Sequence, residues 1–314
     1  MGPYLRPFLA MIGVLLSGIA RYGIAAMPEA PEKLSDIVIE APEPRFVAPT
    51  RRDKIGRIWA PVMINGKGPF RLVLDTGASR SGITAKVAET LGIPLDQSRS
   101  VLLRGVIGSV AVPTVRVDSF AVGDVIVTPA TLPIVTDALG GAEGILGTEG
   151  FSDKRIYIDF KHDLITIARS HGERARADFV TIPVERSAAG LLMFHAVVGG
   201  VRIQAIIDTG GQATIGNEAM REALVRRHAQ GTPNQIIDVT TEAQDGETFS
   251  SPPIVLGSIQ IRGARITYGD MHIFHHWHLT QEPALLIGMD ALGLLDIFII
   301  DYRRHELQLR TRAD

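Results

Sequence analysis

Two copies of the tripeptide Asp-Thr-Gly are the residues of this sequence best suited to chemistry. The first copy begins at Asp75 in "LVLDTGASRSGI", and the second begins at Asp208 in "AIIDTGGQATIG". Each copy follows an apolar run, so we expect each aspartate at the end of a strand, where the glycine permits a sharp turn. One such tripeptide is weak evidence, because capped turns use the same residues. Two copies in equivalent surroundings are stronger evidence of a site.

Two carboxylates brought together could perform acid–base chemistry without a metal or a cofactor. Like charges at short range oppose ionisation of both groups, so the pKa of one is raised strongly and the pair shares a proton. The ionised member could accept a proton from a water molecule while the protonated member polarises a carbonyl. This chemistry suits the hydrolysis of a peptide bond.

The segments around the two tripeptides also repeat. Alternating apolar residues with a turn, "NGKG" in the first copy and "GG" in the second, predict a β-hairpin before each tripeptide. A short helical pattern follows each one, with Thr84 and Asn217 as expected N-caps. Each copy ends with two apolar residues and a glycine, a strand with Ile-Asp-aromatic, and a closing strand, within residues 144–167 and 285–309.

The repeat predicts an all-β fold of two similar lobes related by a pseudo-twofold, with few short helices. We expect the N-terminal lobe over residues 56–170 and the C-terminal lobe over residues 171–314. The polar segment at residues 169–179 would connect them. Pseudo-twofold packing would bring the two Asp-Thr-Gly loops face to face.

Composition narrows the possible partners. The chain has 314 residues, 46% hydrophobic and 21% charged, which is enough for two cores. A formal net charge of -2 without a basic run argues against a nucleic-acid partner. The absence of cysteine excludes disulfides, thiol nucleophiles and thiolate metal sites.

The N-terminal sequence predicts export. Arg6 precedes "FLAMIGVLLSGIA", an apolar stretch of 13 residues, and small residues follow near Ala25. We expect residues 1–26 to form a signal peptide, or an uncleaved anchor that associates with the membrane. Residues 27–55, rich in proline and charge, are expected to form a linker or arm. Both interpretations place the body outside the cytoplasm, in the periplasm or secreted.

The two loops and their surroundings resemble the aspartic proteases of the pepsin and retropepsin group. "LVLDTGASRSGITAKVAETLGI" is similar to the retropepsin-type pattern, and "GILGTEGFSDKRIYIDFKHDLITIA" resembles a pepsin-type segment. The resemblance extends over residues 56–311. It implies lobes of the acid-protease (pepsin-like) type and an aspartic endopeptidase with Asp75 and Asp208 as catalytic residues. It implies a polypeptide substrate and no cofactor, and two loops in one chain favour a monomer.

The same resemblance implies supporting roles for the neighbouring residues. Thr76 and Thr209 would join the two loops through reciprocal bonds to backbone, and Gly77 and Gly210 would permit the turns. Two short strands would thread beside the loops, namely Ile145-Leu146-Gly147 and Leu286-Ile287-Gly288.

The second loop departs from the family pattern at its last two residues. Gly211 and Gln212 stand where the family prefers Ala or Ser followed by Ser, Thr or Asp. The glutamine amide can still donate and accept hydrogen bonds. The departure leaves open an alternative, a non-catalytic peptide-binding module of the same fold.

A flap over the substrate is expected within residues 102–115, with its tip at Gly105, Val106, Ile107 and Gly108. The alternative is an ordinary surface hairpin. The matching region of the second half, residues 240–253, is polar and loop-like, so we assign no second flap.

A histidine cluster offers a third hypothesis, a metal-dependent hydrolase. "MHIFHHWHL" holds His272, His275, His276 and His278, and on a strand three of them would share one face. A strand spaces such ligands too far apart for one ion, so we assign no metal. A surface strand, or an edge that faces substrate or membrane with Trp277, is favoured.

Overall fold

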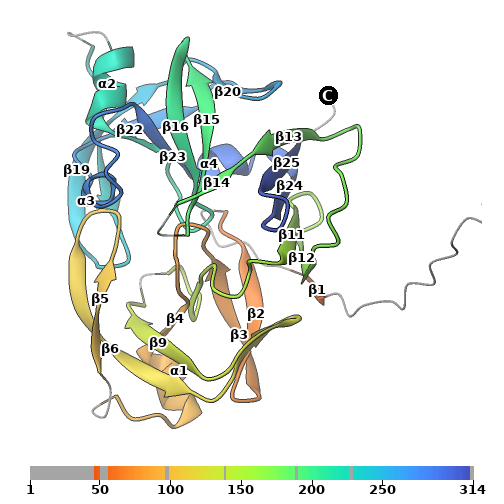
Figure 1. Cartoon of the computed structure of the whole chain (residues 1–314). Coiled ribbons are helices and arrows are strands. Elements are labelled where there is room, and N and C mark those ends of the chain that lie inside the picture. The colour runs from red at the N-terminus through yellow and green to blue at the C-terminus, as the bar shows by residue number, and fades with distance from the viewer. Residues whose placement is uncertain are drawn as a thin grey trace, which may run out of the picture. The chain divides into compact units, whose positions relative to one another are not determined.

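The computed structural model describes residues 46–49, 56–95, 99–137, 139–187, 190–225 and 229–311. The segment expected to be a signal peptide or anchor lies outside these residues. So does the expected arm, apart from strand β1 (Phe46–Pro49). Strands predominate over a few short helices, as the sequence predicts (Figure 1). No helix in the described ranges is both long and apolar enough to span a membrane.

The first lobe is built on one sheet. Its nine strands in the described part of the chain follow the order β5-β6-β9-β4-β10-β3-β2-β7-β8. The strands are β2 (Trp59–Ile64), β3 (Lys67–Leu74), β4 (Gly82–Thr84), β5 (Ser100–Arg104), β6 (Ser109–Val117), β7 (Phe120–Val122), β8 (Val125–Val127), β9 (Ala130–Val135) and β10 (Gly144–Leu146). Helix α1 (Ala85–Leu91) follows β4.

The second lobe repeats this order of elements. Its sheet follows the order β18-β19-β22-β17-β23-β16-β15-β20-β21, with β14 beside β15. The strands are β14 (Glu185–Arg186), β15 (Leu192–Val198), β16 (Val201–Ile207), β17 (Ile215–Gly216), β18 (Thr232–Ile237), β19 (Ala243–Ser250), β20 (Ile254–Leu256), β21 (Ile259–Ile261), β22 (Arg265–Tyr268) and β23 (Ala284–Ile287). The helices are α2 (Glu218–Leu224), α3 (His272–His276) and α4 (Met289–Leu292).

A third sheet draws strands from both lobes. Its order is β1-β12-β11-β24-β25-β13, where β11 is Lys154–Asp159, β12 Leu164–Arg169, β13 Val180–Pro183, β24 Leu295–Asp301 and β25 Glu306–Thr311. The central pair, β11 with β24, joins the lobes. Its register centres on Tyr157 opposite Ile299, which stand two residues before the matching Asp159 and Asp301. This symmetric register is what a pseudo-twofold through the centre of the sheet requires.

The expected local elements are present on each side of that axis. Hairpin β2–β3 turns at Asn65 and Gly66, and hairpin β15–β16 turns at Gly199 and Gly200, all four with positive φ. Positive φ at both central residues gives the turn whose twist matches a two-residue hairpin. Asn217 caps α2 by accepting a hydrogen bond from Met220, whereas Thr84 precedes α1 without a capping side-chain bond.

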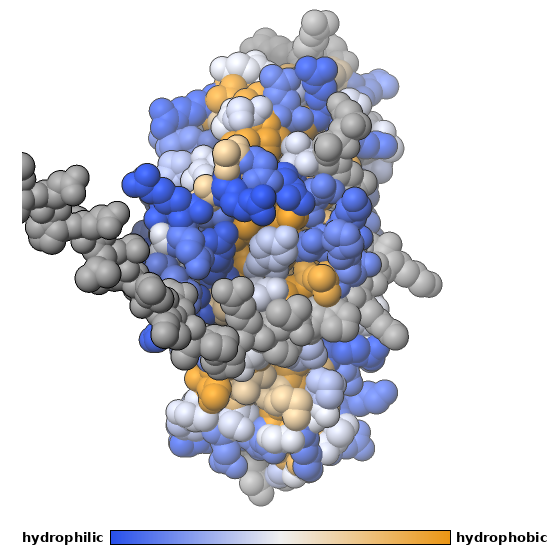
Figure 2. Space-filling view, turned by 90° about the vertical axis from the view of Figure 1, so that its right-hand side faces the viewer, coloured by the Kyte–Doolittle hydropathy of each residue, from blue (hydrophilic) through white to orange (hydrophobic). Residues whose placement is uncertain are grey.

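The main core is continuous across the two lobes. One cluster of buried side chains includes Leu74 and Leu146 from the first lobe and Ile207 and Phe298 from the second. On the side of the third sheet, the surface shows hydrophobic residues scattered between hydrophilic ones (Figure 2). The segment between Ser170 and Phe179 has no regular secondary structure.

Two sequence-based expectations were wrong. The histidine cluster does not form a strand, because His272–His276 is helix α3, with Ile273 and Phe274 buried on its inner side. The polar region at residues 240–253 is not a loop, since β19 occupies Ala243–Ser250 and pairs with β18. The second lobe therefore has its own hairpin at the position of the first-lobe flap.

Candidate active site

Each aspartate lies at the end of a buried strand that pairs in parallel with a threading strand. In the first lobe, β3 pairs with β10, and the Asp75 amide donates to the carbonyl oxygen of Leu146 at 2.9 Å. In the second, β16 pairs with β23, and the Asp208 amide donates to the carbonyl oxygen of Ile287 at 3.0 Å. The threading strands that the resemblance implied are therefore confirmed in position. Their hydrogen bonds hold the backbone of Asp75 and Asp208 in place.

Glycine at the end of each threading strand allows the close approach. A Cβ on Gly147 would lie 2.5 Å from the backbone carbon of Arg80, and a Cβ on Gly288 would lie 2.5 Å from the Ala213 carbonyl oxygen. Real Cβ contacts are not that short, so any other residue would push the threading strand away from its loop.

Each loop is further held by a hydroxyl and a carboxylate that the sequence analysis missed. In the first lobe, Gly147 donates its amide to Ser81 Oγ at 3.0 Å, and Ser81 donates its amide to Glu149 Oε1 at 2.6 Å. In the second, Gly288 donates to Thr214 Oγ1 at 3.2 Å, and Thr214 Oγ1 donates to Asp290 Oδ1 at 2.6 Å. In both copies the hydroxyl stands six residues after the aspartate and the carboxylate two after the glycine, and that repeat was visible in the sequence.

The two threonines bind the loops to each other. Thr76 donates its amide to Thr209 Oγ1, and Thr209 donates its amide to Thr76 Oγ1, both at 3.1 Å. Each hydroxyl then donates across the junction, Thr76 Oγ1 to the Ile207 carbonyl at 2.8 Å and Thr209 Oγ1 to the Leu74 carbonyl at 2.7 Å. Both threonines are buried, so these bonds satisfy backbone groups that water does not reach. The reciprocal arrangement that the resemblance implied is present.

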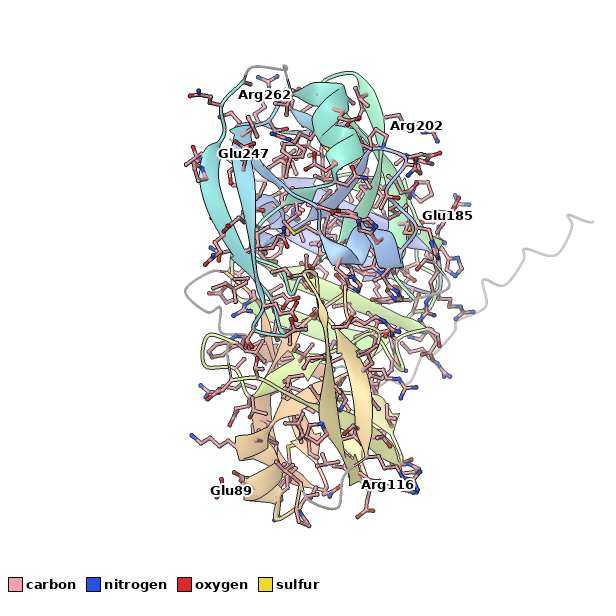
Figure 3. The ribbon with its side chains drawn as sticks, turned by 90° about the vertical axis from the view of Figure 1, so that its left-hand side faces the viewer. Glu89, Arg116, Glu185, Arg202, Glu247 and Arg262 are labelled. Atoms are coloured by element: carbon pink, nitrogen blue, oxygen red, sulfur yellow. The ribbon has the colours of Figure 1, made fainter. Side chains whose placement is uncertain are left out.

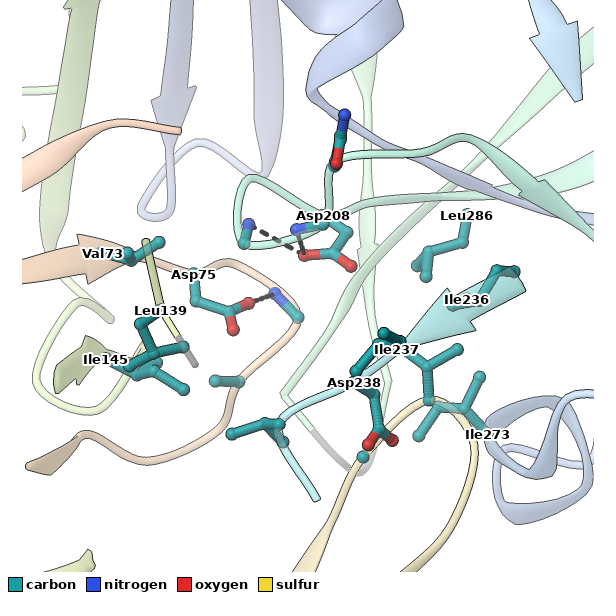
Figure 4. A pocket seen from close by; sticks show the side chains of 18 of the residues that line it. Val73, Asp75, Leu139, Ile145, Asp208, Ile236, Ile237, Asp238, Ile273 and Leu286 are labelled. Carbon is teal, nitrogen blue, oxygen red and sulfur yellow. Dashed lines mark hydrogen bonds between the residues drawn. The ribbon is translucent and has the colours of Figure 1, made fainter. Parts of the chain in front are cut away.

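The threonine bonds bring the two carboxyl groups together. A Cβ on Gly77 would lie 3.2 Å from Asp75 Oδ1 and also 3.2 Å from Asp208 Oδ1, so both carboxyl groups converge on one point. Gly77 donates its amide to Asp75 Oδ1 at 2.8 Å, and Gly210 donates to Asp208 Oδ1 at 2.9 Å. Figure 4 shows the two carboxyl groups facing the same space.

Their proximity perturbs the titration of both groups. Burial, followed by the charge of Asp208, raises the pKa of Asp75 to about 8. Burial also raises the pKa of Asp208, against the amides of Gly211 and Gly210 and the charge of Arg57, which favour its ionised form. Two backbone amides favour the ionised form of each aspartate, and Arg57 adds its charge at Asp208, so the pair shares one proton that this charge biases towards Asp75.

The glycine that departs from the family pattern has a defined place. Gly211 donates its amide to Asp208 Oδ1 at 2.9 Å. A Cβ on Gly211 would lie 2.6 Å from Asp208 Oδ2, whereas Ala78 occupies the equivalent position beside Asp75. Glycine at position 211 therefore leaves room for the Asp208 carboxylate in its observed orientation. Compared with Ala78 in the first loop, it lacks only a methyl group. Gln212 is exposed at the cleft.

The pair lies in a cleft of about 660 Å³ between two apolar clusters (Figure 4). The first-lobe cluster comprises Val73, Val135, Leu139, Ala142 and Ile145, with Trp59, Ala78, Leu103 and Val239 packed against it. The second-lobe cluster comprises Leu191, Ile206, Ile215, Met271, Ile273, Phe274, Ala284 and Leu286, with Val106, Ile107, Met193, Ala213, Ile236, Trp277 and Leu279 packed against it. An extended chain across the cleft would meet apolar surface on both sides of the carboxyl groups.

Two hairpins roof the cleft, and their tips meet (Figure 3). The tip of β5–β6, expected from the sequence at Gly105–Gly108, donates the Ile107 amide to Asp238 Oδ2 at 2.8 Å in the tip of β18–β19. The Val106 carbonyl accepts the Ile273 amide of α3 at 3.0 Å. Each tip reaches the opposite lobe, since Val106 packs against the second-lobe cluster and Val239 against the first. The structure thus places the expected flap residues over the cleft and adds a second hairpin.

Two of the four histidines contact residues outside the cluster. His275 contacts Asp270 Oδ1 through Nε2 at 2.6 Å, and His272 Nε2 lies 3.3 Å from Ser109 Oγ. Among the described residues, no three His, Cys, Asp or Glu side chains are grouped so that they could hold a metal ion.

Comparison with known families agrees with this geometry. Residues 60–149, which run from β2 to the carboxylate that supports the first loop, match the family model described as aspartyl protease. Over these residues the chain is similar to aspartyl proteases. No curated protein sequence matches the chain. The match stops before the second loop, but the second lobe repeats every element of the first, so the whole is a two-lobed all-β aspartic protease fold. The family supports a protease-type function.

Proposed function

We propose that the protein is an aspartic endopeptidase that hydrolyses peptide bonds with a water molecule held between Asp75 and Asp208. The observation that carries the proposal is the convergence of two carboxyl groups with raised pKa, the half-buried Asp75 and the buried Asp208, at the floor of one cleft. A pair that shares one proton offers a base and an acid at the same place. The family match over residues 60–149 supports this reading.

The protonation pattern gives each aspartate a role. Asp208, whose ionised form is favoured by two amides and by Arg57, takes a proton from the water as the water oxygen bonds to the carbonyl carbon. Asp75, which holds the shared proton, donates it to the carbonyl oxygen. In the resulting tetrahedral diol, Asp208 returns its proton to the amide nitrogen. The C–N bond breaks as Asp75 regains a proton from a hydroxyl, leaving an amine and a carboxylic acid.

The test is cleavage of a diverse peptide library from pH 3 to 8 by the wild type and by Asp75→Asn and Asp208→Asn. Each variant is expected to lose activity by a factor of about 10² to 10⁴, the usual contribution of a positioned acid or base. Asp118→Asn, an exposed carboxylate in the first lobe, is the matched control. Peptide binding without turnover by the wild type would instead favour the non-catalytic module. Full activity in either active-site variant would rule out the shared-water mechanism.

We also propose that the protein is exported and acts as a monomer on polypeptides. Export is supported by the apolar stretch "FLAMIGVLLSGIA" behind Arg6, and a monomer by the presence of both loops in one chain. Cell fractionation with sequencing of the mature N-terminus distinguishes a cleaved signal from an anchor. Recovery of the full-length chain in the cytosol would contradict export.

A further inference from the structure

The cleft is symmetric in its backbone but not in its charge. The fifth residue after the aspartate is Arg80 in the first loop and Ala213 in the second, and both line the cleft. The last residue of the outer flap strand is Arg104 in β5 and Ile237 in β18, and both again line the cleft. At two equivalent pairs of positions, the first lobe therefore presents a guanidinium where the second presents an apolar side chain.

The two arginines stand on two first-lobe elements that line the cleft, the floor loop and the flap strand β5. Ala78, two residues before Arg80, and Leu103, immediately before Arg104, both pack against the first-lobe cluster. In the second lobe, two residues pack against the corresponding cluster. They are Ala213, the counterpart of Arg80, and Ile236, which immediately precedes Ile237. The floor loop and the flap strand of the first lobe thus carry one cation each at the cleft.

Neither cation is neutralised within the described part of the chain. Arg80 and Arg104 are exposed, and neither lies within salt-bridge distance of a described carboxylate. Burial, followed by the charge of Arg104, lowers the pKa of His276 on α3. Two further carboxylates line the cleft, and each accepts a hydrogen bond: Asp238 from the Ile107 amide, and Asp290 from the Thr214 hydroxyl.

We propose that the first-lobe side of the cleft binds an acidic side chain of the substrate through Arg80 and Arg104, while the second-lobe side binds an apolar one. A carboxylate fits these donors because guanidinium groups bind carboxylates through paired, charge-assisted hydrogen bonds. Ala213 and Ile237 offer no such donor. The substrate would therefore bind in one direction, with Asp or Glu on one side of the scissile bond.

The inference rests on the proposed peptidase function, and matched peptides test it. A cleaved peptide is remade with Glu or Gln at each position in turn, and kcat/KM is measured at neutral pH. At one position the Glu peptide is expected to be cleaved about tenfold faster than the Gln peptide, a factor in keeping with charged hydrogen bonds that are partly solvated. The preference should weaken as salt is raised.

The variants Arg80→Gln and Arg104→Gln are expected to bring that ratio towards one, because kcat/KM should fall more for the Glu peptide than for the Gln peptide. Arg116→Gln is the matched control, since Arg116 is an exposed arginine of the same hairpin that lies away from the cleft (Figure 3). Arg80→Glu should favour a Lys peptide at the same position. A ratio near one at every position in the wild type, or a ratio that both Gln variants leave intact, overturns the inference.

Binding separates this inference from the peptidase proposal. Fluorescence anisotropy of labelled Glu and Gln peptides is measured on the Asp75→Asn protein, which keeps both arginines. If the wild type cleaves no peptide but this protein prefers the Glu peptide, the peptidase proposal fails and the acidic subsite stands. No preference in either binding or cleavage rejects the subsite.

Discussion

At the two aspartates, burial and mutual repulsion make the folded protein hold a proton more tightly than the unfolded chain. Asp75 titrates near its ordinary value of 3.8 when unfolded and near 8 when folded. Its contribution to stability is thus fully present below about pH 3.8 and is lost as pH rises through about 8. At neutral pH the folded protein is therefore less stable than it would be without the two adjacent carboxyl groups.

Replacing Asp75 by Asn removes that pH-dependent loss. Because the amide cannot ionise and can still accept the Gly77 amide, Asp75→Asn should be more stable than the wild type at pH 8, with a melting temperature higher by about 5 °C or more. The difference should shrink towards pH 4, where Asp75 is largely protonated in the unfolded chain as well as in the folded protein. Thermal denaturation across this range measures it, and Asp118→Asn should show no such trend. A difference between Asp75→Asn and wild type that does not change with pH would contradict the raised pKa.

Gly211 gives a second test at the residue scale. Gly211→Ala makes the second loop resemble the first, but its Cβ would lie 2.6 Å from Asp208 Oδ2. The carboxylate would have to turn away from the two amides that orient it, so kcat should fall by about tenfold or more while KM changes less. Ala78→Gly is the matched change in the first loop and removes a methyl without a clash. Wild-type kcat in Gly211→Ala would show that glycine is not needed there.

The sequence predicted the residues that repeat but not the contacts that depend on folding. The sequence showed Asp75, Asp208 and the two threonines as candidate site residues, because the same tripeptide occurs at the equivalent place in both halves. The supporting hydroxyl–carboxylate pairs, such as Ser81 with Glu149, repeat equally well. They were missed because serine and glutamate are common and the two members are separated by 68 residues. The raised pKa could be anticipated only from proximity, which the threonine bonds create.

At the scale of elements, the sequence did not predict the secondary structure where the side chains are mostly exposed, because such segments show no periodic pattern of apolar residues. Most side chains of β18 and β19 are exposed or half-buried, so this hairpin lacks the alternation of apolar and polar residues that marks a strand. Helix α3 has five residues, too few for a helical period to emerge from "HIFHH". The hairpins before each aspartate were predicted correctly because they pack one face on the core and turn at Asn-Gly or Gly-Gly.

The meeting of the two hairpin tips predicts an effect on substrate binding. Asp238→Ala removes the acceptor of the Ile107 amide and of the Thr240 amide that shapes its own turn. Loss of these bonds should loosen the roof and raise KM about 2- to 10-fold, with kcat changed less. Asp238→Asn keeps one acceptor oxygen, enough for either the Ile107 or the Thr240 amide, and should raise KM less. Steady-state kinetics on one cleaved peptide decides the matter: equal damage from both changes would show that charge, not the tip contact, is what counts.

At the scale of the molecule, the two lobes share more than the sequence repeat implies. The repeat correctly predicted two similar halves, but it treats each as a unit. The structure instead has one core cluster with side chains from both, a central sheet that pairs β11 with β24, and loops that satisfy each other's buried backbone groups. These contacts connect residues far apart in the chain, so they cannot be predicted from a local sequence pattern.

This sharing predicts that neither half is stable alone. A chain broken between Glu173 and Arg174, in the connection without regular structure, would separate β11 from β24 and leave Thr76 without Thr209. Each half expressed alone should lack a cooperative unfolding transition, because its part of the shared core and several backbone groups would be exposed. Co-expressed halves should associate and recover peptidase activity, which Asp208→Asn in the second half should abolish. Circular dichroism and activity assays measure both outcomes. A first half that folds and cleaves peptides as a homodimer would show instead that the lobes are self-sufficient and that their fusion only ensures pairing.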